Sequence, residues 1–216
     1  MNNYKNFFFD LDGTITDSKE SILYCLEKAL HDYGIVADIS ILEKFIGPSL
    51  YESFHKYYNF SGNLLDEVIQ KYRKYYTFGP MYESPLFHGI EDVFKILKQK
   101  HKKLYIATAK ETSQAKKIIA HKGLQFYFQG IYGADDSLNI FHKEQVIEHL
   151  LKQNNLISAE SVMIGDKEHD IFGAKRHGVF SIAVRWGYAF SGELEKSQPD
   201  VIVDTIDTLK TLLSSD

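Results

Sequence analysis

The sequence predicts an α/β fold with a doubly wound parallel sheet and a smaller, all-helical insert. Short apolar runs typical of buried strands alternate with amphipathic helical patterns, which is the arrangement of right-handed βαβ units. Between residues 17 and 83 no strand pattern occurs, and the apolar spacing is helical throughout. We therefore assign residues 1–16 and 84–216 to a core domain and residues 17–83 to a helical domain inserted into it.

Six apolar runs, each bounded by polar residues or glycine, are the expected strands of the core. They lie at residues 7–9, 104–107, 130–132, 162–164, 181–184 and 201–203. The first helix of the insert is expected to begin with a capping box formed by Asp17 and Glu20 and to stop at Gly34. Gly47 and Pro48 break the next helical stretch.

Composition and charge exclude several classes of protein. Hydrophobic residues make up 44% and charged residues 25% of the chain, which is ordinary for a soluble globular protein. The net charge of -4 gives no basic footprint for a nucleic-acid polymer. Cys25 is the only cysteine, which excludes an internal disulfide. No apolar run reaches the ~18 residues of a membrane-spanning helix, and no signal peptide is recognisable, so we expect a cytoplasmic protein.

Polar side chains follow several of the expected strands. Asp10 and Asp12 come directly after the first strand, Thr108 after the second and Asp166 after the fourth, while Lys143 opens the helix before that fourth strand. Ligands bind at the carboxyl ends of the strands in parallel sheets, and these ends lie at one edge. We therefore expect these groups to converge on one site.

The segment Asp10–Thr14 carries the central argument. Alternate residues of an extended chain share a face, so Asp12 can lie near Asp10, and Gly13 lets the backbone approach a ligand closely. Two neighbouring carboxylates suit metal binding, nucleophilic attack and general acid–base catalysis. The structural alternative is an ordinary Asp-Gly turn after a strand.

A second acidic segment, GDKEHD at residues 165–170, contains Asp166 and Asp170. Their oxygens suit Mg²⁺, although acids are also favoured at a helix N-terminus for their interaction with the helix dipole. The hydroxyl of Thr108 and the ammonium of Lys143 can hold phosphate oxygens. Each group alone is weak evidence, whereas their combination in this order indicates phosphoryl chemistry.

These segments resemble the four motifs of the phosphatases of the haloacid dehalogenase superfamily. DLDGT resembles the first motif, Thr108 in IATAK the second, Lys143 the third and GDKEHD the fourth. The core is similar to the Rossmann-like core of that family, and the insert to its C1 cap domain. FIGPSL at residues 45–50 and RWGY at residues 185–188 are similar to segments of the phosphoglycolate phosphatase-like branch, which includes bacterial proteins described as 5′-nucleotidases.

The resemblance implies a mechanism. Asp10 attacks phosphorus and becomes an aspartyl phosphate, and Asp12 first protonates the leaving alcohol and then activates water. Mg²⁺ is held by Asp10, by the backbone carbonyl of Asp12 and by Asp166, with Asp170 in or next to this set of ligands. An aspartate at position 12 favours a phosphatase over a dehalogenase.

The phosphate is expected to lie among Thr108, Lys143 and the segments around Gly13, Thr14 and Ala109. Ala109 replaces an asparagine found in many relatives, so only its backbone amide is offered. Lys110 is an extra cation, for which a solvated position at a helix start is the default expectation.

Residues of the insert are expected to recognise the rest of the substrate. Phe45, beside Gly47 and Pro48, is a candidate for stacking on a nucleobase. Arg73 is the only arginine of the insert, and we expect it to be solvated. A nucleoside 5′-monophosphate is therefore favoured over phosphoglycolate, for which Lys44 or Lys56 would have to bind the carboxylate.

Two other functions stay open at this point. A phosphomutase of the same fold would return the phosphoryl group to a substrate, and a degenerate relative would only bind. The intact set of Asp10, Asp12, Lys143 and Asp166 argues against the second. The expected partner is a small phosphorylated metabolite, not a nucleic-acid polymer or a membrane, and the sequence is compatible with a monomer or a homodimer.

Overall fold

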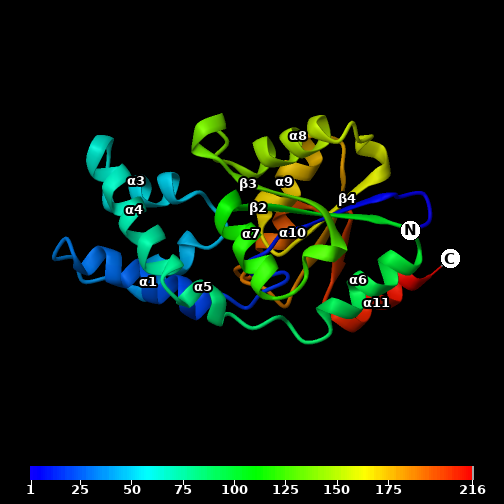
Figure 1. Ribbon diagram of the computed structural model, residues 1–216, viewed down its shortest axis with the longest axis horizontal. Coiled ribbons are helices and arrows are strands. Elements are labelled where there is room, and N and C mark those ends of the chain that lie inside the picture. The colour runs from blue at the N-terminus through cyan, green and yellow to red at the C-terminus, as the bar shows by residue number, and fades with distance from the viewer. Residues whose placement is uncertain (216) are drawn as a thin grey trace.

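The computed structural model describes residues 1–215 as a parallel six-stranded sheet covered by helices, with a helical unit at one end (Figure 1). The strands coincide with the six predicted runs and are β1 (Asn6–Phe9), β2 (Lys103–Glu111), β3 (Phe128–Ala134), β4 (Ser161–Gly165), β5 (Phe180–Val184) and β6 (Val201–Val203). The N-terminus and the last described helix, α11 (Ile206–Ser214), lie at the end of the molecule opposite the helical unit.

The strand order is β3-β2-β1-β4-β5-β6, and every neighbouring pair is parallel. β1 lies in the middle, with Phe8 paired to Tyr105 of β2 on one side and to Met163 of β4 on the other. The direction of winding reverses between β1 and β4, which confirms the predicted doubly wound α/β fold. Such a reversal is the point where these sheets bind ligands.

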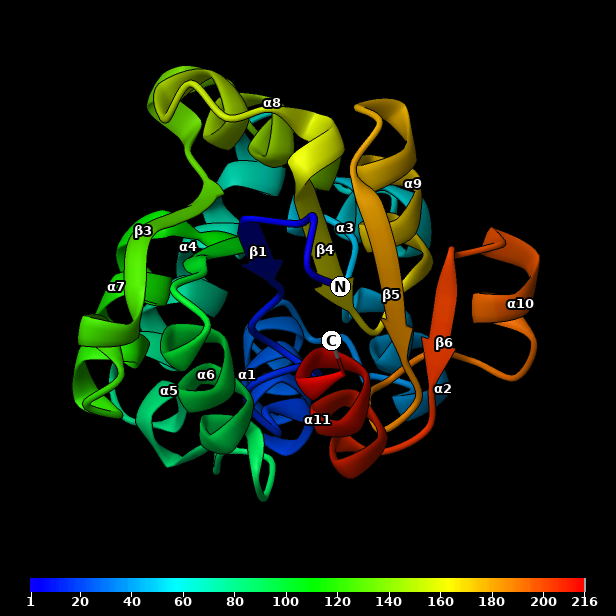
Figure 2. The same ribbon diagram turned by 90° about the vertical axis from the view of Figure 1, so that its right-hand side faces the viewer.

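Helices cover both faces of the sheet, which explains why β1 is a continuous apolar run rather than an alternating one. Phe7 and Phe9 face the side of α6 (Ile90–Gln99) and α11 (Ile206–Ser214), and the Phe9 ring meets Phe94 edge-on at 5.2 Å. Phe8 points to the opposite side. Figure 2 shows α8 (Lys143–Gln153) and α9 (Glu168–Arg176) on that side, opposite α6 and α11.

The remaining core elements are short or lie at the rim. They are α7 (Thr112–His121), α10 (Glu193–Ser197) and 3₁₀ turns at Gln125–Tyr127, Asp136–Leu138 and Ser158–Glu160. No helix among the described residues is long and apolar enough to cross a membrane.

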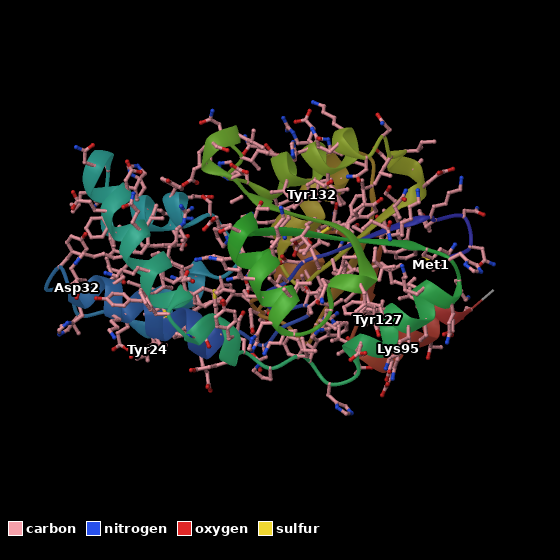
Figure 3. The ribbon with its side chains drawn as sticks, viewed as in Figure 1. Met1, Tyr24, Asp32, Lys95, Tyr127 and Tyr132 are labelled. Carbon is pink, nitrogen blue, oxygen red and sulfur yellow. The ribbon has the colours of Figure 1, made fainter. Side chains whose placement is uncertain are left out.

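The insert contains helices and no strand, as predicted. Its elements are α1 (Lys19–His31), α2 (Ile39–Leu42), the 3₁₀ turn η1 (Glu43–Phe45), α3 (Leu50–Tyr58), α4 (Gly62–Thr77) and α5 (Pro80–Glu83). Asp32, labelled at the far end of this unit in Figure 3, joins α1 to α4 because its carboxylate accepts hydrogen bonds from Lys71 (2.8 Å) and Tyr75 (2.7 Å).

The chain enters and leaves the insert through two adjacent linkers. Thr16 pairs with Leu86, and the Asp17 amide donates to the Pro85 carbonyl at 2.8 Å. The change from sheet to purely helical structure occurs at these linkers, and the division into two domains at residues 17 and 83 stays a prediction.

Two local expectations are wrong. The capping box of Asp17 and Glu20 does not form, because α1 begins one residue later with Ser18 at its N-cap, and the Asp17 carboxylate accepts a hydrogen bond from Tyr188 instead. Thr108 does not follow β2 but lies within it, at an irregularity in the pairing of β2 with β3 between Ala107 and Glu111. In both cases tertiary partners, not local propensity, decide where the element ends.

Candidate active site

Three buried carboxylates meet at the carboxyl ends of the central strands β1 and β4. Asp10 directly follows β1, Asp166 directly follows β4, and Asp170 lies in the first turn of α9. Each offers a carboxylate oxygen, and these oxygens lie within 4.8 Å of one another. The predicted convergence of strand ends therefore brings these three side chains together.

Lys143 supplies the positive charge inside this cluster. Its Nζ lies 2.8 Å from Oδ1 of Asp10 and 2.7 Å from Oδ1 of Asp170, and it donates to the Ala107 carbonyl at 2.9 Å. Burial lowers the pKa of Lys143, but attraction by Asp10 and Asp170 outweighs burial and raises this pKa to about 12. Lys143 is therefore a fixed cation at neutral pH.

The cluster nevertheless carries an excess of negative charge. Burial raises the pKa of Asp10 to about 6, because the attraction of Lys143 does not offset desolvation together with repulsion from Asp170. Burial and the charges of Asp10 and Asp170 raise the pKa of Asp166 well above its usual range. Three carboxylates beside one ammonium form a donor set that fits a hard divalent cation such as Mg²⁺, whose charge would offset this repulsion.

Asp166 is held from two sides. The Thr14 hydroxyl donates to its Oδ1 at 3.1 Å, and the Tyr188 amide donates to its Oδ2 at 2.7 Å. Gly13 lies against the same carboxylate at a φ of +84°, where a Cβ would stand only 2.3 Å from Asp166 Oδ2. Gly13 and Thr14 thus shape the acidic cluster directly, and their predicted contact with substrate stays a prediction.

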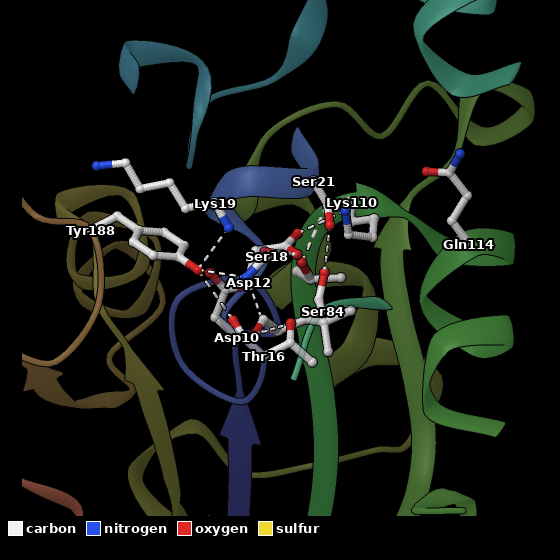
Figure 4. Close-up of polar contacts among 12 residues, drawn as sticks. Asp10, Asp12, Thr16, Ser18, Lys19, Ser21, Ser84, Lys110, Gln114 and Tyr188 are labelled. Atoms are coloured by element: carbon white, nitrogen blue, oxygen red, sulfur yellow. Dashed lines mark hydrogen bonds and ion pairs between the residues drawn. The ribbon is translucent and has the colours of Figure 1, made fainter. Parts of the chain in front are cut away.

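Asp12 lies outside the carboxylate cluster, in a separate polar network that Figure 4 shows. Its Oδ1 accepts a hydrogen bond from the Ser18 hydroxyl at 2.6 Å, and its Oδ2 lies 2.9 Å from Lys110 Nζ. Since its carboxylate lies apart from the other three, the backbone carbonyl of Asp12 is the metal contact that the resemblance implies.

Lys110 is buried, and the expectation of a solvated lysine is wrong. Its side chain is 5% exposed, and its Nζ lies 4.1 Å from the centre of the Tyr76 ring in α4. Burial lowers the pKa of Lys110, but the charge of Asp12 and the neighbouring Tyr72 outweigh it and raise that pKa. Lys110 therefore connects the core strand β2 with both Asp12 and the insert.

A cleft between this edge and the insert brings the remaining predicted residues together. Its walls include Asp10, Asp12, Phe45, Gly47, Pro48, Thr108 and Ala109. Thr108 is buried, and its Oγ1 accepts a hydrogen bond from the Lys110 amide at 3.2 Å. The core and the insert therefore contribute opposite walls of one cleft.

The aromatic residues of the insert differ in how open they are to the cleft. Phe45 is only 3% exposed and packs edge-on against Phe54 at 4.9 Å, so most of its ring belongs to the core of the insert. Tyr51 in α3 is partly exposed and faces Phe141 of the core domain at 5.2 Å. This pair, at the cleft wall, was not predicted from the sequence.

Arg73 lines the cleft, and the expectation that it is solvated is wrong. Its Nη1 and Nη2 lie 2.7 and 3.2 Å from the two carboxylate oxygens of Asp136, and its side chain is 20% exposed. The Tyr51 hydroxyl donates to the same carboxylate at 3.4 Å. Asp136 belongs to the core domain, so this ion pair joins the insert to the core beside the cleft.

The sequence reasoning missed Ser18, Tyr188 and Asp136, and misjudged Lys110 and Arg73. None of the three missed residues stands at the end of a predicted strand or in a spacing that chemistry requires. Only the resemblance of RWGY to a family segment marked the region of Tyr188.

Known proteins resemble this chain over nearly its whole length. The family described as haloacid dehalogenase-like hydrolase matches residues 7–184. A 5′-nucleotidase from Pseudomonas aeruginosa is 36% identical over 213 residues, covering 98% of this chain and 96% of that protein. The tyrosine-protein kinase PtkA of Mycobacterium tuberculosis is 32% identical over 208 residues, covering 95% of this chain and 71% of PtkA. The crystal structure of a predicted phosphatase from Clostridium acetobutylicum superposes with a TM-score of 0.93 at 36% identity, covering 97% of this chain and 98% of that one.

The matched family segment spans the first acidic motif through the second, including Asp10, Thr108, Lys143 and Asp166. The resemblance inferred from these residues is therefore confirmed. The chain belongs to the haloacid dehalogenase-like hydrolases and is a phosphatase of that family.

Proposed function

We propose that this protein is a Mg²⁺-dependent phosphatase that hydrolyses a small phosphate monoester through a phosphoryl intermediate on Asp10. The observation that carries the proposal is the position of Asp10, which is buried next to Asp166 and Asp170 with Lys143 Nζ 2.8 Å from its Oδ1. A carboxylate held so rigidly is suited to attack phosphorus.

The proposed reaction has two steps, in which Asp10 carries the phosphoryl group and Asp12 transfers the proton. In the first, Asp10 forms a bond to phosphorus while the bond from phosphorus to the leaving oxygen breaks and Asp12 gives that oxygen a proton. In the second, Asp12 takes a proton from a water molecule that attacks phosphorus, and the Asp10 carboxylate is released. Ser18 and Lys110 hold the Asp12 carboxylate between these steps.

The phosphoryl oxygens are bound by groups already at this edge of the sheet. Lys143 offers its ammonium, Thr108 its hydroxyl and Ala109 its backbone amide. Asp10, Asp166 and Asp170 would hold Mg²⁺, which when bound neutralises phosphoryl charge that would otherwise repel the Asp10 carboxylate. Asp12 would add its backbone carbonyl.

The insert acts as a cap over the cleft in this proposal. It provides one wall, and the linkers at residues 16–17 and 82–85 are the expected hinges. Closure would exclude bulk water from the phosphoryl group and hold the rest of the substrate against the insert.

A nucleoside 5′-monophosphate is the leading substrate candidate. The 36% identical 5′-nucleotidase supports it, as does the partly exposed pair Tyr51 and Phe141, which offers an aromatic surface in the cleft. Because Phe45 is buried, we assign the stacking role predicted for it to Tyr51 and Phe141 instead. Arg73 in the cleft wall keeps phosphoglycolate as the second candidate, because arginine is the cation best shaped for a carboxylate.

A panel of phosphorylated metabolites assayed with Mg²⁺ tests the proposal. We expect release of inorganic phosphate, with the highest kcat/KM for a nucleoside 5′-monophosphate, and no activity in Asp10→Asn. An isomerised product without phosphate release would indicate a phosphomutase instead. No turnover of any substrate on a broad panel would favour a binding protein, and a kcat/KM for phosphoglycolate above that of every nucleotide would reverse the substrate order.

A further inference from the structure

We propose that the hydroxyl of Tyr188 is a positioning group for Asp12, acting through the first linker of the insert. The inference rests on the acid–base role proposed above for Asp12. Tyr188 lies in the loop after β5, 170 residues from Ser18 along the chain, yet its ring reaches the start of α1 (Figure 4).

The Tyr188 hydroxyl has a full set of hydrogen-bond partners in this linker. Its oxygen accepts from the backbone amides of Ser18 at 2.6 Å and Lys19 at 3.1 Å, and its proton is donated to the Asp17 carboxylate at 2.8 Å. Burial and the hydrogen bond to Asp17 raise the pKa of Tyr188, so the phenol keeps the proton that it donates. Three consecutive residues are therefore held by one side chain.

The side chain that would ordinarily cap α1 is turned toward Asp12 instead. The first amides of a helix need acceptors, and a serine at the N-cap position usually supplies its own hydroxyl oxygen. Ser18 makes no such side-chain cap, and its buried hydroxyl donates to Asp12 Oδ1 at 2.6 Å. Tyr188 accepts from the amides of Ser18 itself and of Lys19, and it thereby fixes the backbone of Ser18, whose hydroxyl is oriented toward Asp12.

The backbone of Tyr188 is fixed to the acidic cluster at the same time. Its amide donates to Asp166 Oδ2 at 2.7 Å, and its carbonyl accepts from Lys167 Nζ at 3.2 Å. The Tyr188 ring therefore sets the distance between the loop that contains Asp166 and residues 17–19, where the Ser18 hydroxyl contacts Asp12. Asp12 gains a defined position relative to the phosphoryl site, although it shares no carboxylate contact with the cluster.

Tyr188→Phe tests the proposal because it removes only the hydroxyl and keeps both the ring and the amide bonded to Asp166. We expect kcat for a nucleoside 5′-monophosphate to fall ~10-fold, a part of the ~10²- to 10⁴-fold that general acid catalysis supplies. The loss for para-nitrophenyl phosphate should be at most about twofold, because its leaving group needs little protonation. The Mg²⁺ concentration for half-maximal activity should not change.

A matched control separates positioning from a general loss of stability. Tyr127→Phe also removes one phenol–carboxylate hydrogen bond, the 2.8 Å bond to Glu91 in α6. It should leave kcat for both substrates unchanged. Ser18→Ala removes the hydrogen bond from Ser18 to Asp12. It should lower kcat for the nucleotide more than for para-nitrophenyl phosphate, as Tyr188→Phe does. If Tyr188→Phe does not fold, Ser18→Ala still tests the path to Asp12, and equal losses on both substrates in Ser18→Ala overturn the proposal.

The double variant Tyr188→Phe/Ser18→Ala should lose no more activity than the worse single variant, because both act on Asp12 through one path. Equal losses on both substrates, losses that add in the double variant, or no loss in either single variant would overturn the proposal while leaving the phosphatase intact. A wild-type protein without turnover would instead overturn the proposed function, and this inference with it.

Discussion

Lys110 and Asp12 form an ion pair of 2.9 Å between Nζ and Oδ2, with side chains only 5% and 15% exposed. The pair joins strand β2 to the second aspartate of the first acidic motif, and Lys110 Nζ lies over the Tyr76 ring of the insert. Removing one partner of a buried pair leaves the other charge without compensation, which costs more than the pair itself contributes.

Lys110→Met should lower the free energy of unfolding by about 2 kcal/mol, less than for a fully buried pair because Asp12 keeps Ser18 and some solvent. Lys5→Met is the matched control, since its 2.7 Å pair with Glu160 is 66% exposed on the lysine side and should contribute little. Denaturant unfolding measures both. A double variant Lys110→Met/Asp12→Asn that is less stable than Lys110→Met alone would contradict this account.

Asp10→Asn should nearly abolish turnover, because an amide is not a nucleophile toward phosphorus. The fold should persist with an unchanged or higher thermal midpoint, since the substitution removes one of three clustered like charges. Single-turnover assays and circular dichroism measure the two effects. Retention of more than about a tenth of the activity, with deamidation excluded by mass spectrometry, would show that Asp10 is not the nucleophile.

Asp12→Asn should reduce kcat for a nucleoside 5′-monophosphate by ~10²-fold or more, the scale of general acid catalysis. The reduction should be smaller for para-nitrophenyl phosphate, whose leaving group is a weaker base. Steady-state kinetics on the two substrates give the comparison. Equal losses of kcat on the two substrates would show that Asp12 is not the general acid.

Chelation by EDTA should stop turnover, and Mg²⁺ should restore it. Asp166→Ala should raise the Mg²⁺ concentration for half-maximal activity, because it removes one oxygen ligand from the buried cluster. Asp32→Ala, at the far end of the insert, is the control and should leave that concentration unchanged. Full activity in metal-free buffer would refute the magnesium site.

Arg73→Met and Asp136→Asn should lower kcat/KM to a similar extent, about three- to tenfold, because each breaks the same bidentate contact between the insert and the core. The double variant should be no worse than either single variant. If Arg73→Met lost far more activity than Asp136→Asn, and only on substrates with a carboxylate, Arg73 would be contacting the substrate directly.

Most of the core fold could be predicted because its signals are local. The run Phe7–Phe9 is apolar without alternation, and a strand buried on both faces requires this pattern. Asp10 directly follows that strand, so its position at the carboxyl end of the sheet could be predicted. Asp166 could be placed in the same way, because it directly follows β4. Parallel strands carry their ends to one edge, so residues more than a hundred positions apart could be assigned to one site before any contact was known.

The polar network beyond this edge could not be predicted in the same way. Lys110, Arg73 and Asp17 are long or charged side chains whose sequence neighbours are compatible with solvent exposure. Their burial or pairing depends on Asp12, Asp136 and Tyr188, which are distant in the sequence and approach only in the folded chain. The start of α1 shifted for the same reason, because a phenol from another loop supplies an acceptor there.

The alternation of strands and helices, the helical insert and the polar groups at the strand ends could all be predicted from the sequence, because hydrophobic periodicity and turn chemistry act over a few residues. The pairing of charges, the burial of Phe45, the edge-on packing of Tyr51 against Phe141 and the contact of Ser18 with Asp12 required the folded chain. Those outcomes depend on distances between segments that no local pattern encodes, and on the cost of burying a charge or a polar group without a partner.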